Sequence, residues 1–447
     1  MFPPFPQELA HHYCKSLISR LDSGTVKIVQ QGRESEERKG QGIMLGCLVC
    51  YEKNTSKRVI LYANSGNGKT LVFNNSDSEE YSLSEKVVPS LVSIDKINEA
   101  LSEYDKEIHN LTDKINTLDK GELRSSLIKQ RTSLTDISLR RVFDLYSFTR
   151  FDGNVVTLNE IIKKHGGRLP PTGTGDCCAP KLLSYAFSHN LMPISMDEVY
   201  YGPNTKTKVN GISYEPCDDR CGYILPSILG LEILYRDSDI IVVNKESGLL
   251  SVPGKGEDKQ DCVESRVKAL FPSCIKQSAV HRLDMETSGV LVLAFNKRAH
   301  RELNKQFAEG KVSKKYVALL EGMLHSVPEG RIELKTRLDI YNRPYQVLDP
   351  VEGKLGVTEW KKLGIRTITP KDTDDKIRLT LIEFTPLTGR THQLRLAAKY
   401  GLNIPIYGDS LYNDHKVSDR LMLHSFYISF IHPTSKLPIE IVTPSPF

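Results

Sequence analysis

A predicted helix at 94–118 separates the N-terminal part of this chain from the rest. Its apolar residues recur alternately three and four positions apart. Within 94–118 this spacing keeps one apolar seam along a helix, as in a coiled coil. The seam consists of Ile94, Ile97, Leu101, Tyr104, Ile108, Leu111, Ile115 and Leu118. Gly121 breaks the pattern, and a looser helical pattern runs from Leu123 to about Leu145. We therefore expect an antiparallel helical hairpin over 91–149, acting as a packing arm, with contact to RNA or a partner as the alternative.

The segment before this hairpin, residues 1–90, has short alternating apolar runs separated by Gly and Asn turns, which predicts a small β-rich module. Within it, "NSGNGKT" looks like a phosphate-binding loop. However, Ala63 stands where that motif requires glycine, and no buried strand leads directly into a helix. We expect a turn here and no nucleotide cofactor.

The segment after the hairpin, residues 150–225, contains two pairs of cysteines. A loop rich in Pro and Gly enters a predicted helix near residue 180. Cys217-x3-Cys221 has the spacing of half a structural zinc site, and Cys177 with Cys178 would supply the other half. The side chains of adjacent residues point in different directions, which makes Cys177 and Cys178 an awkward pair of ligands. The alternative is that these cysteines are buried or loop thiols that bind no metal. Structural zinc is therefore one of two open readings.

Composition limits the compartment and the partners. The chain has 447 residues, a net charge of +5 and nine cysteines without a regular framework. No export signal or apolar run of membrane length is visible, so we expect a cytoplasmic protein that does not contact membranes. Cys47-x2-Cys50 lies in a strand-like run, which places these two thiols in a core.

The chain from 226 to 447 alternates strands with a few helices and many hairpins. This pattern favours an α+β fold with a mixed, largely antiparallel central sheet. We expect helices at 262–271, 297–309 and 391–400, a turn followed by a strand at 279–295, and strands at 315–322 and 421–432. The stretch 297–315 has seven Lys/Arg against two Glu, so it is either a solvated helix face or a phosphate-contacting stripe.

The stretch "AVHRLDMETSGVLVLA", residues 279–294, brings polar groups next to an apolar strand. Alone, Asp284 would be a turn or cap acceptor. His281 and Asp284 are too few for a metal site, and Ser288 has no nucleophile-elbow context. The later "TGRTHQLR" sets arginines before a helix, and Arg390 is the cation we expect to pair with Asp284 and keep it ionised.

Five stretches, in order, resemble the RluA family of RNA pseudouridine synthases. "HRLDMETSG" is similar to its signature H-R-L-D-x-x-T-S-G, and the other four are "VVNKESGLLSVPG", "KKYVALLEG", "TGRTHQLR" and "IYGDSLY". The resemblance covers about 230–447. Departures include Glu246 where proline is usual, and altered residues after "TGRTHQLR". The segment with "GTGDCCAPK" also resembles an accessory region of a longer bacterial subgroup.

The resemblance implies conversion of uridine to pseudouridine within RNA, an isomerisation that requires no cofactor. Asp284 would be the catalytic carboxylate, either attacking C1′ or promoting loss of the 2′ proton. Arg390 would hold it ionised. Tyr316 would stack on the base and assist removal of the C5 proton.

The remaining implied residues would contact the RNA. Arg282 would enter the space left by the flipped nucleotide, with a phosphate contact as the alternative. His281 is either structural, the reading we favour, or a substrate contact, and Leu423 packs on the nucleotide or in the core. Further substrate contacts would be Lys245, Lys314, Lys315, His392, Gln393 and Arg395.

The expected partner is structured RNA, with a tRNA anticodon-loop uridine, a 23S rRNA loop uridine, or both as targets. We expect a monomer. A catalytically inert RNA-binding or ribosome-assembly factor on the same scaffold is the main alternative, and a zinc-dependent hydrolase using the cysteines is a third.

Overall fold

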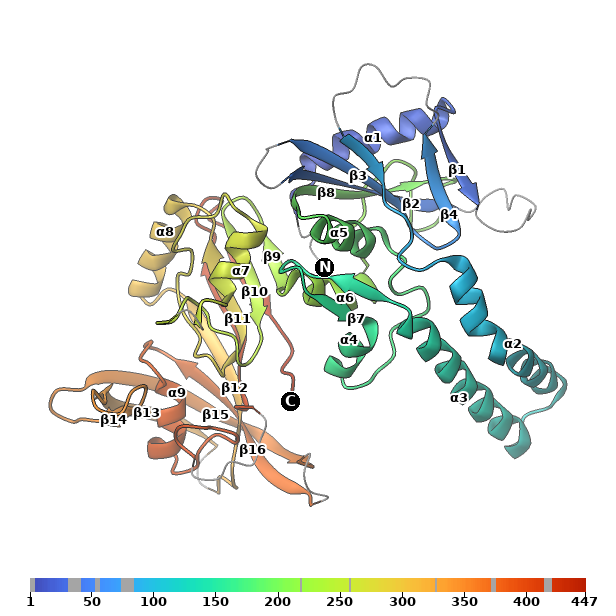
Figure 1. Ribbon diagram of the computed structural model, residues 1–447. Coiled ribbons are helices and arrows are strands. Elements are labelled where there is room, and N and C mark those ends of the chain that lie inside the picture. The colour runs from blue at the N-terminus through green and yellow to red at the C-terminus, as the bar shows by residue number, and fades with distance from the viewer. Residues whose placement is uncertain are drawn as a thin grey trace. The chain divides into compact units, whose positions relative to one another are not determined.

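The chain forms two compact units, Met1–Glu232 and Ile233–Phe447. In this computed structural model the described residues are 5–30, 42–52, 57–73, 84–217, 219–256, 259–325, 328–370, 375–413 and 420–447 (Figure 1). Among these residues, no helix combines the length and hydropathy needed to cross a membrane.

The first unit is built on a four-stranded sheet in the order β5-β3-β2-β8. Its strands are β2 (Ile43–Glu52), β3 (Arg58–Asn64), β5 (Ser84–Val87) and β8 (Leu191–Tyr201). Side chains alternate between the two faces of a strand. On one face Leu45, Cys47 and Val49 pack with helix α1 (Glu8–Asp22). On the other, Gly46 lies against helix α5 (Cys178–Ser188).

This sheet changes the predicted domain boundaries. β8 comes from the predicted accessory segment 150–225, yet it pairs with β2 of the predicted module 1–90 from Ile43 to Glu52. The segments 1–90 and 150–225 therefore share one sheet rather than forming separate domains. Cys47 and Cys50 are buried in this sheet, as predicted. The smaller elements of the unit are β1 (Val26–Gln30), β4 (Lys69–Phe73), β6 (Ser147–Thr149), β7 (Val155–Thr157), α4 (Leu158–Lys164) and α6 (Cys221–Leu229).

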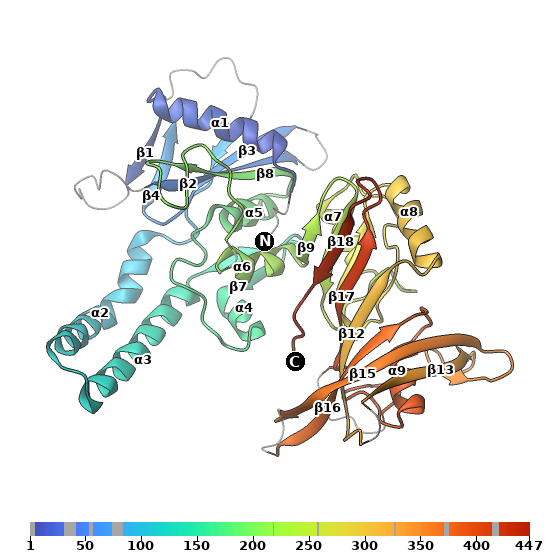
Figure 2. The ribbon, with the colours of Figure 1, turned by 180° about the vertical axis from the view of Figure 1, so that it is seen from behind.

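Two local predictions in the first unit are confirmed. Helices α2 (Ile94–Thr117) and α3 (Glu122–Asp144) run antiparallel on either side of Gly121 (Figure 2). Arg141 of α3 is hydrogen-bonded to Glu103 and lies 5.1 Å from the ring centroid of Tyr104. The "NSGNGKT" stretch is a turn between β3 and β4, so a strand and not a helix follows it.

The second unit contains a ten-stranded sheet in the order β14-β13-β15-β16-β12-β17-β11-β10-β9, with β18 beside β17. Its strands are β9 (Glu232–Arg236), β10 (Ile240–Lys245), β11 (Ser288–Ala294), β12 (Ser313–Leu320), β13 (Glu329–Leu338), β14 (Gln346–Leu348), β15 (Lys354–Ile368), β16 (Ile377–Pro386), β17 (Leu423–Ile431) and β18 (Pro438–Val442). The register shows antiparallel pairs except β11 with β17, which is parallel. The predicted α+β class, with a mixed and largely antiparallel sheet, is confirmed.

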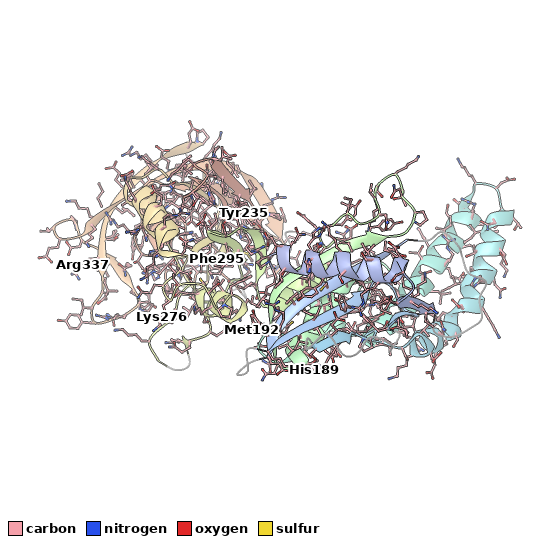
Figure 3. The ribbon with its side chains drawn as sticks, turned by 90° about the horizontal axis from the view of Figure 1, so that it is seen from above. His189, Met192, Tyr235, Lys276, Phe295 and Arg337 are labelled. Carbon is pink, nitrogen blue, oxygen red and sulfur yellow. The ribbon has the colours of Figure 1, made fainter. Side chains whose placement is uncertain are left out.

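Helices α7 (Val263–Leu270) and α8 (Lys297–Ala308) match their predicted positions. Ala299 and Leu303 of α8 pack on Val290 and Val292 of β11, and Tyr235 borders this core (Figure 3). The predicted helix 391–400 is a short α-helix, α9 (Gln393–Leu396), followed by a π-helical turn, Ala397–Gly401. The predicted turn and strand at 279–295 are a loop followed by β11, which begins at Ser288. Side chains rather than a neighbouring strand bind most of the backbone of this loop.

Strands β11, β17 and β12 lie side by side, and this order assembles the site. Gly289 of β11 is in register with Ser425 of β17, and Ser425 is in register with Tyr316 of β12. Gly289 has φ +119°, and a Cβ there would lie 2.2 Å from the carbonyl O of Ser425. Only glycine permits this approach.

We expect Gly289→Ala to lower the free energy of unfolding of the second unit by about 3 kcal/mol or more, because both strain and a backbone clash are introduced. The single tryptophan, Trp360, is buried in β15, so its fluorescence in urea reports this unit. The control is Gly310→Ala, which has φ +69° and open space around the added Cβ. It should cost only about 1–2 kcal/mol. Equal losses would contradict the close approach of β11 and β17.

Candidate active site

A cavity of about 1050 Å³ in the second unit brings most of the predicted site residues together. That volume is ample for one nucleotide. The predicted residues that line it are His281, Arg282, Asp284, Lys314, Tyr316, Arg390, His392, Gln393, Arg395 and Leu423. Lys245 and Lys315 are not among the lining residues.

The loop 279–287, which carries Asp284, is held from beneath by side chains. Glu264 of α7 accepts hydrogen bonds from the backbone N–H groups of Ser278 and Ala279. The hydroxyl of Ser251 donates to the carbonyl O of Leu283 (2.7 Å) and accepts from the N–H of the same residue (3.0 Å). These side chains fix the loop as far as the residue before Asp284.

Lys245 holds the other side of Asp284. Its buried ammonium donates to the carbonyl oxygens of Met285 (2.9 Å), Leu249 (2.7 Å) and Glu246 (2.9 Å). The prediction that Lys245 contacts substrate at the cavity rim is therefore wrong in position, because this side chain is 1% exposed. Burial lowers the pKa of Lys245 to about 7, and the nearby Asp284 carboxylate opposes that shift.

The Asp284 side chain lines the cavity between these fixed neighbours. Within the described ranges, its carboxylate accepts no hydrogen bond and forms no ion pair, and only its backbone carbonyl is used, by the N–H of Thr287 (3.1 Å). A carboxylate held in place by its backbone, with its oxygens uncommitted, is available to react with a bound molecule.

The expected ion pair between Asp284 and Arg390 is not formed. Arg390 is exposed at the cavity, and its Nε donates to the carbonyl O of Leu355 (3.0 Å). Two buried basic side chains, Lys245 and Arg395, lie near Asp284 instead. Burial works to lower the pKa of Arg395, but the hydrogen bond and charge of Asp409, with the charges of Glu286 and Asp284, raise it.

Arg395 was predicted to contact substrate, and the structure instead places it beneath the cavity surface. Its guanidinium pairs with both carboxylate oxygens of Asp409 and lies 3.0 Å from Glu286. Its side chain is 2% exposed. A bidentate buried pair of this kind has little freedom to release its partners. Arg395 therefore organises the floor of the site.

Gln393 is also structural, contrary to the prediction. Its side-chain oxygen accepts from the hydroxyl of Thr388 and the N–H of Arg390, and its amide donates to Val357 and Thr358. Both polar atoms of the Gln393 side chain have hydrogen-bond partners within the protein. Gln393 therefore shapes the turn that carries Arg390.

His392 is buried but lines the cavity, and its Nδ1 lies 2.8 Å from the hydroxyl of Tyr412. Its φ of +55° turns the chain into α9. Burial lowers the pKa of His392 and Asp284 opposes this. The lowered pKa favours a neutral imidazole, which can donate or accept hydrogen bonds with a base or sugar without adding charge.

Tyr316 and Leu423 form the apolar wall near Asp284. Both line the cavity, on the adjacent strands β12 and β17. Burial raises the pKa of Tyr316 to about 12, and Asp284 adds to the shift. The phenol is therefore neutral at physiological pH and offers an aromatic face and a hydroxyl to a planar base.

His281 makes the contacts expected of a structural histidine, and it also lines the cavity. Its Nε2 accepts a hydrogen bond from the N–H of Val292 (3.1 Å), and its ring stacks on Phe307 at 4.9 Å between centroids. Burial, assisted by Lys314, lowers the pKa of His281 to about 3. A neutral ring is what an Nε2 acceptor requires.

Five basic residues line the cavity: Arg282, Lys311, Lys314, Arg390 and the buried Arg395. Arg282 and Arg390 are exposed, and the described residues give the Arg282 guanidinium no hydrogen bond or ion pair. Lys315, predicted as a substrate contact, instead lies 3.2 Å from Glu383 outside the lining. On α8, Arg298 is paired with Asp239, so only part of the basic stretch 297–315 is available to phosphates.

The second unit also matches known proteins. A family model described as RNA pseudouridylate synthase matches residues 239–399. The chain is 40% identical over 211 residues to the dual-specificity RNA pseudouridine synthase RluA of Yersinia pestis, covering 46% of this chain and 96% of that protein. It is 42% identical over 206 residues to the protein of the same name from Haemophilus influenzae, covering 45% of this chain and 88% of that protein.

The chain belongs to the RluA family of RNA pseudouridine synthases. It is therefore an isomerase whose substrate is RNA, and the inert-factor and hydrolase alternatives are set aside. Among solved structures, the human RNA pseudouridylate synthase domain containing 1 is 30% identical, with a TM-score of 0.40, over 48% of this chain and 84% of that one. Because the bacterial relatives are covered almost completely by less than half of this chain, the N-terminal region is additional to them.

The sequence does not single out five residues that shape the site. Ser251, Glu286, Asp409 and Tyr412 lie within the quoted motif stretches, which do not show what each side chain binds. Glu264 lies outside these stretches, and only the folded chain brings it to the loop before Asp284.

His281 gives a pH-dependent prediction for stability. An unfolded histidine has a pKa near 6.5, whereas burial lowers that of His281 to about 3. Between these values the unfolded state binds a proton that the folded state does not. The free energy of unfolding should therefore fall as pH falls through this window, by at most about 1.4 kcal/mol per pH unit from this group.

We expect His281→Gln to flatten this pH dependence while lowering stability at neutral pH. Urea unfolding followed by Trp360 fluorescence between about pH 7.5 and pH 4.5 measures the difference. The exposed His325→Gln is the control. Parallel wild-type and His281→Gln curves would contradict a buried neutral His281.

Proposed function

We propose that this enzyme converts a uridine of structured RNA to pseudouridine with Asp284 as the carboxylate that acts on the sugar. The observation that carries the proposal is the combination of a clamped backbone and an uncommitted carboxylate facing the cavity. In the reaction the bond from N1 to C1′ breaks, the uracil turns, and C5 bonds to C1′. The C5 proton is lost and N1 gains one, so no oxidant, reductant or added group is needed.

Two buried basic side chains, Arg395 and Lys245, lie close enough to Asp284 for its charge to act on their pKa. Tyr316 and Leu423 would hold the uracil ring, and the neutral phenol would assist loss of the C5 proton.

Base flipping is required, because a stacked nucleotide does not expose C1′ to a side chain in a cavity. Arg282 is two residues from Asp284 and exposed at the cavity. We assign it to the space that the nucleotide vacates, while Lys311, Lys314 and Arg390 contact phosphates.

For the target we propose a tRNA anticodon-loop uridine, a 23S rRNA loop uridine, or both. The relatives that share about 40% identity are named as dual-specificity RNA pseudouridine synthases, which supports an RNA substrate and more than one target. The proposal also assigns the enzyme to the cytoplasm as a monomer. None of its nine cysteines, all within the described residues, forms a disulfide, which suits a reducing compartment.

Asp284→Asn tests the catalytic role. It removes the charge and keeps the shape, so we expect tritium release from RNA containing 5-tritiated uridine to fall by about 10³-fold or more. The exposed Glu329→Gln removes one charge from the same unit and should release tritium like the wild type. Asp284→Asn retaining more than a tenth of wild-type release, with the fold intact by circular dichroism, would contradict the role.

Arg282→Ala tests insertion against phosphate contact. If Arg282 fills the vacated stack, kcat/KM should fall at least tenfold on folded RNA and change little on a short unstructured RNA, whose uridine needs no flipping. A phosphate contact would instead weaken both substrates and reduce the salt slope of binding by about 1. The exposed Lys361→Ala, away from the cavity lining, is the control.

The target itself is tested by mapping pseudouridine in total RNA from a strain lacking the gene, with and without complementation. We expect a uridine in a tRNA anticodon loop or a 23S rRNA loop to lose its modification and regain it on complementation by the wild type only. Loss at neither kind of site would overturn the target assignment and leave the enzyme class unchanged.

A further inference from the structure

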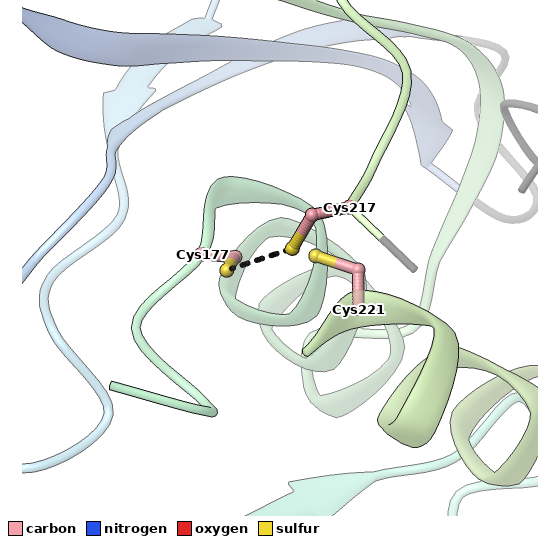
Figure 4. A group of neighbouring side chains, drawn as sticks. All are labelled: Cys177, Cys217 and Cys221. Carbon is pink, nitrogen blue, oxygen red and sulfur yellow. Dashed lines mark hydrogen bonds between the residues drawn. The ribbon is translucent and has the colours of Figure 1, made fainter. Parts of the chain in front are cut away.

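Three cysteine sulfurs from separate segments of the first unit converge on one point (Figure 4). Cys177 is the N-cap of α5, Cys221 is the first residue of α6, and Cys217 lies in the loop between β8 and α6. All three Sγ atoms lie within 4.8 Å of one another. The Sγ atoms of Cys177 and Cys217 are 4.0 Å apart.

These separations suit a shared ion and not a disulfide. A disulfide requires about 2.05 Å between sulfurs. Two thiolates on one tetrahedral zinc, each about 2.3 Å from the metal, lie about 3.8 Å apart. The observed 4.0 Å between Cys177 and Cys217 is close to the second value.

Cys178 takes no part, although the sequence suggested four thiolates. It is fully buried, its Sγ donates to the carbonyl O of Met44 (3.4 Å), and its Cβ side packs where Gly46 leaves room. The adjacent cysteines therefore point apart, one into the sheet and one to the cluster. No fourth Cys, His, Asp or Glu among the described residues joins the cluster.

Two helix N-termini meet at the cluster. Cys177 and Cys221 stand at the N-termini of α5 and α6, helices of 11 and 9 residues, where the helix dipole favours negative charge. Some of the first N–H groups already have partners, since that of Ala179 donates to Glu198 and that of Gly222 to the carbonyl O of Cys217. Cys217 is exposed, which leaves one side of the cluster open to an entering ion and to a fourth ligand.

A second group of potential metal ligands lies in the second unit, but hydrogen bonds within the protein already occupy its ligand atoms. Asp237, Asp239 and His432 also lie together, but their atoms are engaged with the protein. One oxygen of Asp237 accepts from the N–H groups of Asp239 and Ile240, and the other from Tyr235 and the His432 ring. The three sulfurs have only one another as side-chain partners within hydrogen-bonding distance.

We propose that Cys177, Cys217 and Cys221 bind one zinc ion, with a water molecule as the fourth ligand. Three soft thiolates with an open fourth position match zinc better than magnesium or calcium. The ion fastens the stretch after β8, in which no helix or strand is assigned before α6 among the described residues, to the start of α5. Its role is structural, since the cavity with Asp284 belongs to the other unit.

The test uses the full chain purified under reducing conditions without chelator, then mixed with zinc and desalted. Elemental analysis should find about one zinc per chain. Cys217→Ser should lower this at least tenfold, and its exposed position leaves the core intact. Cobalt substitution should give a thiolate-to-cobalt charge-transfer band in the wild type that Cys217→Ser loses.

Cys178→Ala is the matched control, because it removes the neighbouring thiol and should keep the zinc. Cys177→Ser should behave as Cys217→Ser does. The proposal is overturned if the wild type binds no zinc, if Cys217→Ser binds as much as the wild type, or if mass analysis shows a disulfide between Cys177 and Cys217. Tritium release by the same samples reports the catalytic unit separately. A loss of zinc binding can therefore be distinguished from a loss of catalytic activity.

Discussion

The site depends on the clamp that holds the backbone on both sides of Asp284. Ser251 binds both backbone groups of Leu283, and Lys245 binds the carbonyl of Met285. Each bond adds only about 1–3 kcal/mol, but together they fix the orientation of one carboxylate without touching its oxygens. Catalysis at a sugar carbon needs this combination of a rigid backbone and a free side chain.

Charge is arranged around this clamp in two layers. Beneath the surface, Arg395 is paired with Asp409 and Glu286, and Lys245 is enclosed by carbonyl oxygens. At the surface, Arg282 and Arg390 are exposed to the cavity. The buried basic groups thus hold carboxylates and carbonyl oxygens of the protein, whereas the exposed ones would meet phosphates in the proposed complex.

Local features were predictable from the sequence, and long-range ones were not. The seam from Ile94 gave the helical hairpin because helical spacing is a local property. Sequence patterns show charge but not burial, so Arg395 was taken for a surface contact, whereas Asp409 and Glu286 hold it inside. The family resemblance supplied Asp284 as a candidate, and only the order β11-β17-β12 explains why Tyr316 lies beside the same cavity. The sheet of the first unit joins the segments 1–90 and 150–225. Their compositions alone predict two separate domains.

The central claim is that Asp284 meets the sugar of a flipped uridine inside this cavity. The most direct measurement is a crystal structure of the full chain with a stem-loop RNA carrying 5-fluorouridine, since fluorine at C5 cannot leave as a proton and stalls the reaction. The account predicts the modified nucleotide out of its stack, its C1′ next to the Asp284 carboxylate, its base against Tyr316 and Leu423, and Arg282 in the vacated space. A nucleotide bound with its sugar away from Asp284, or still stacked in the RNA, would contradict it.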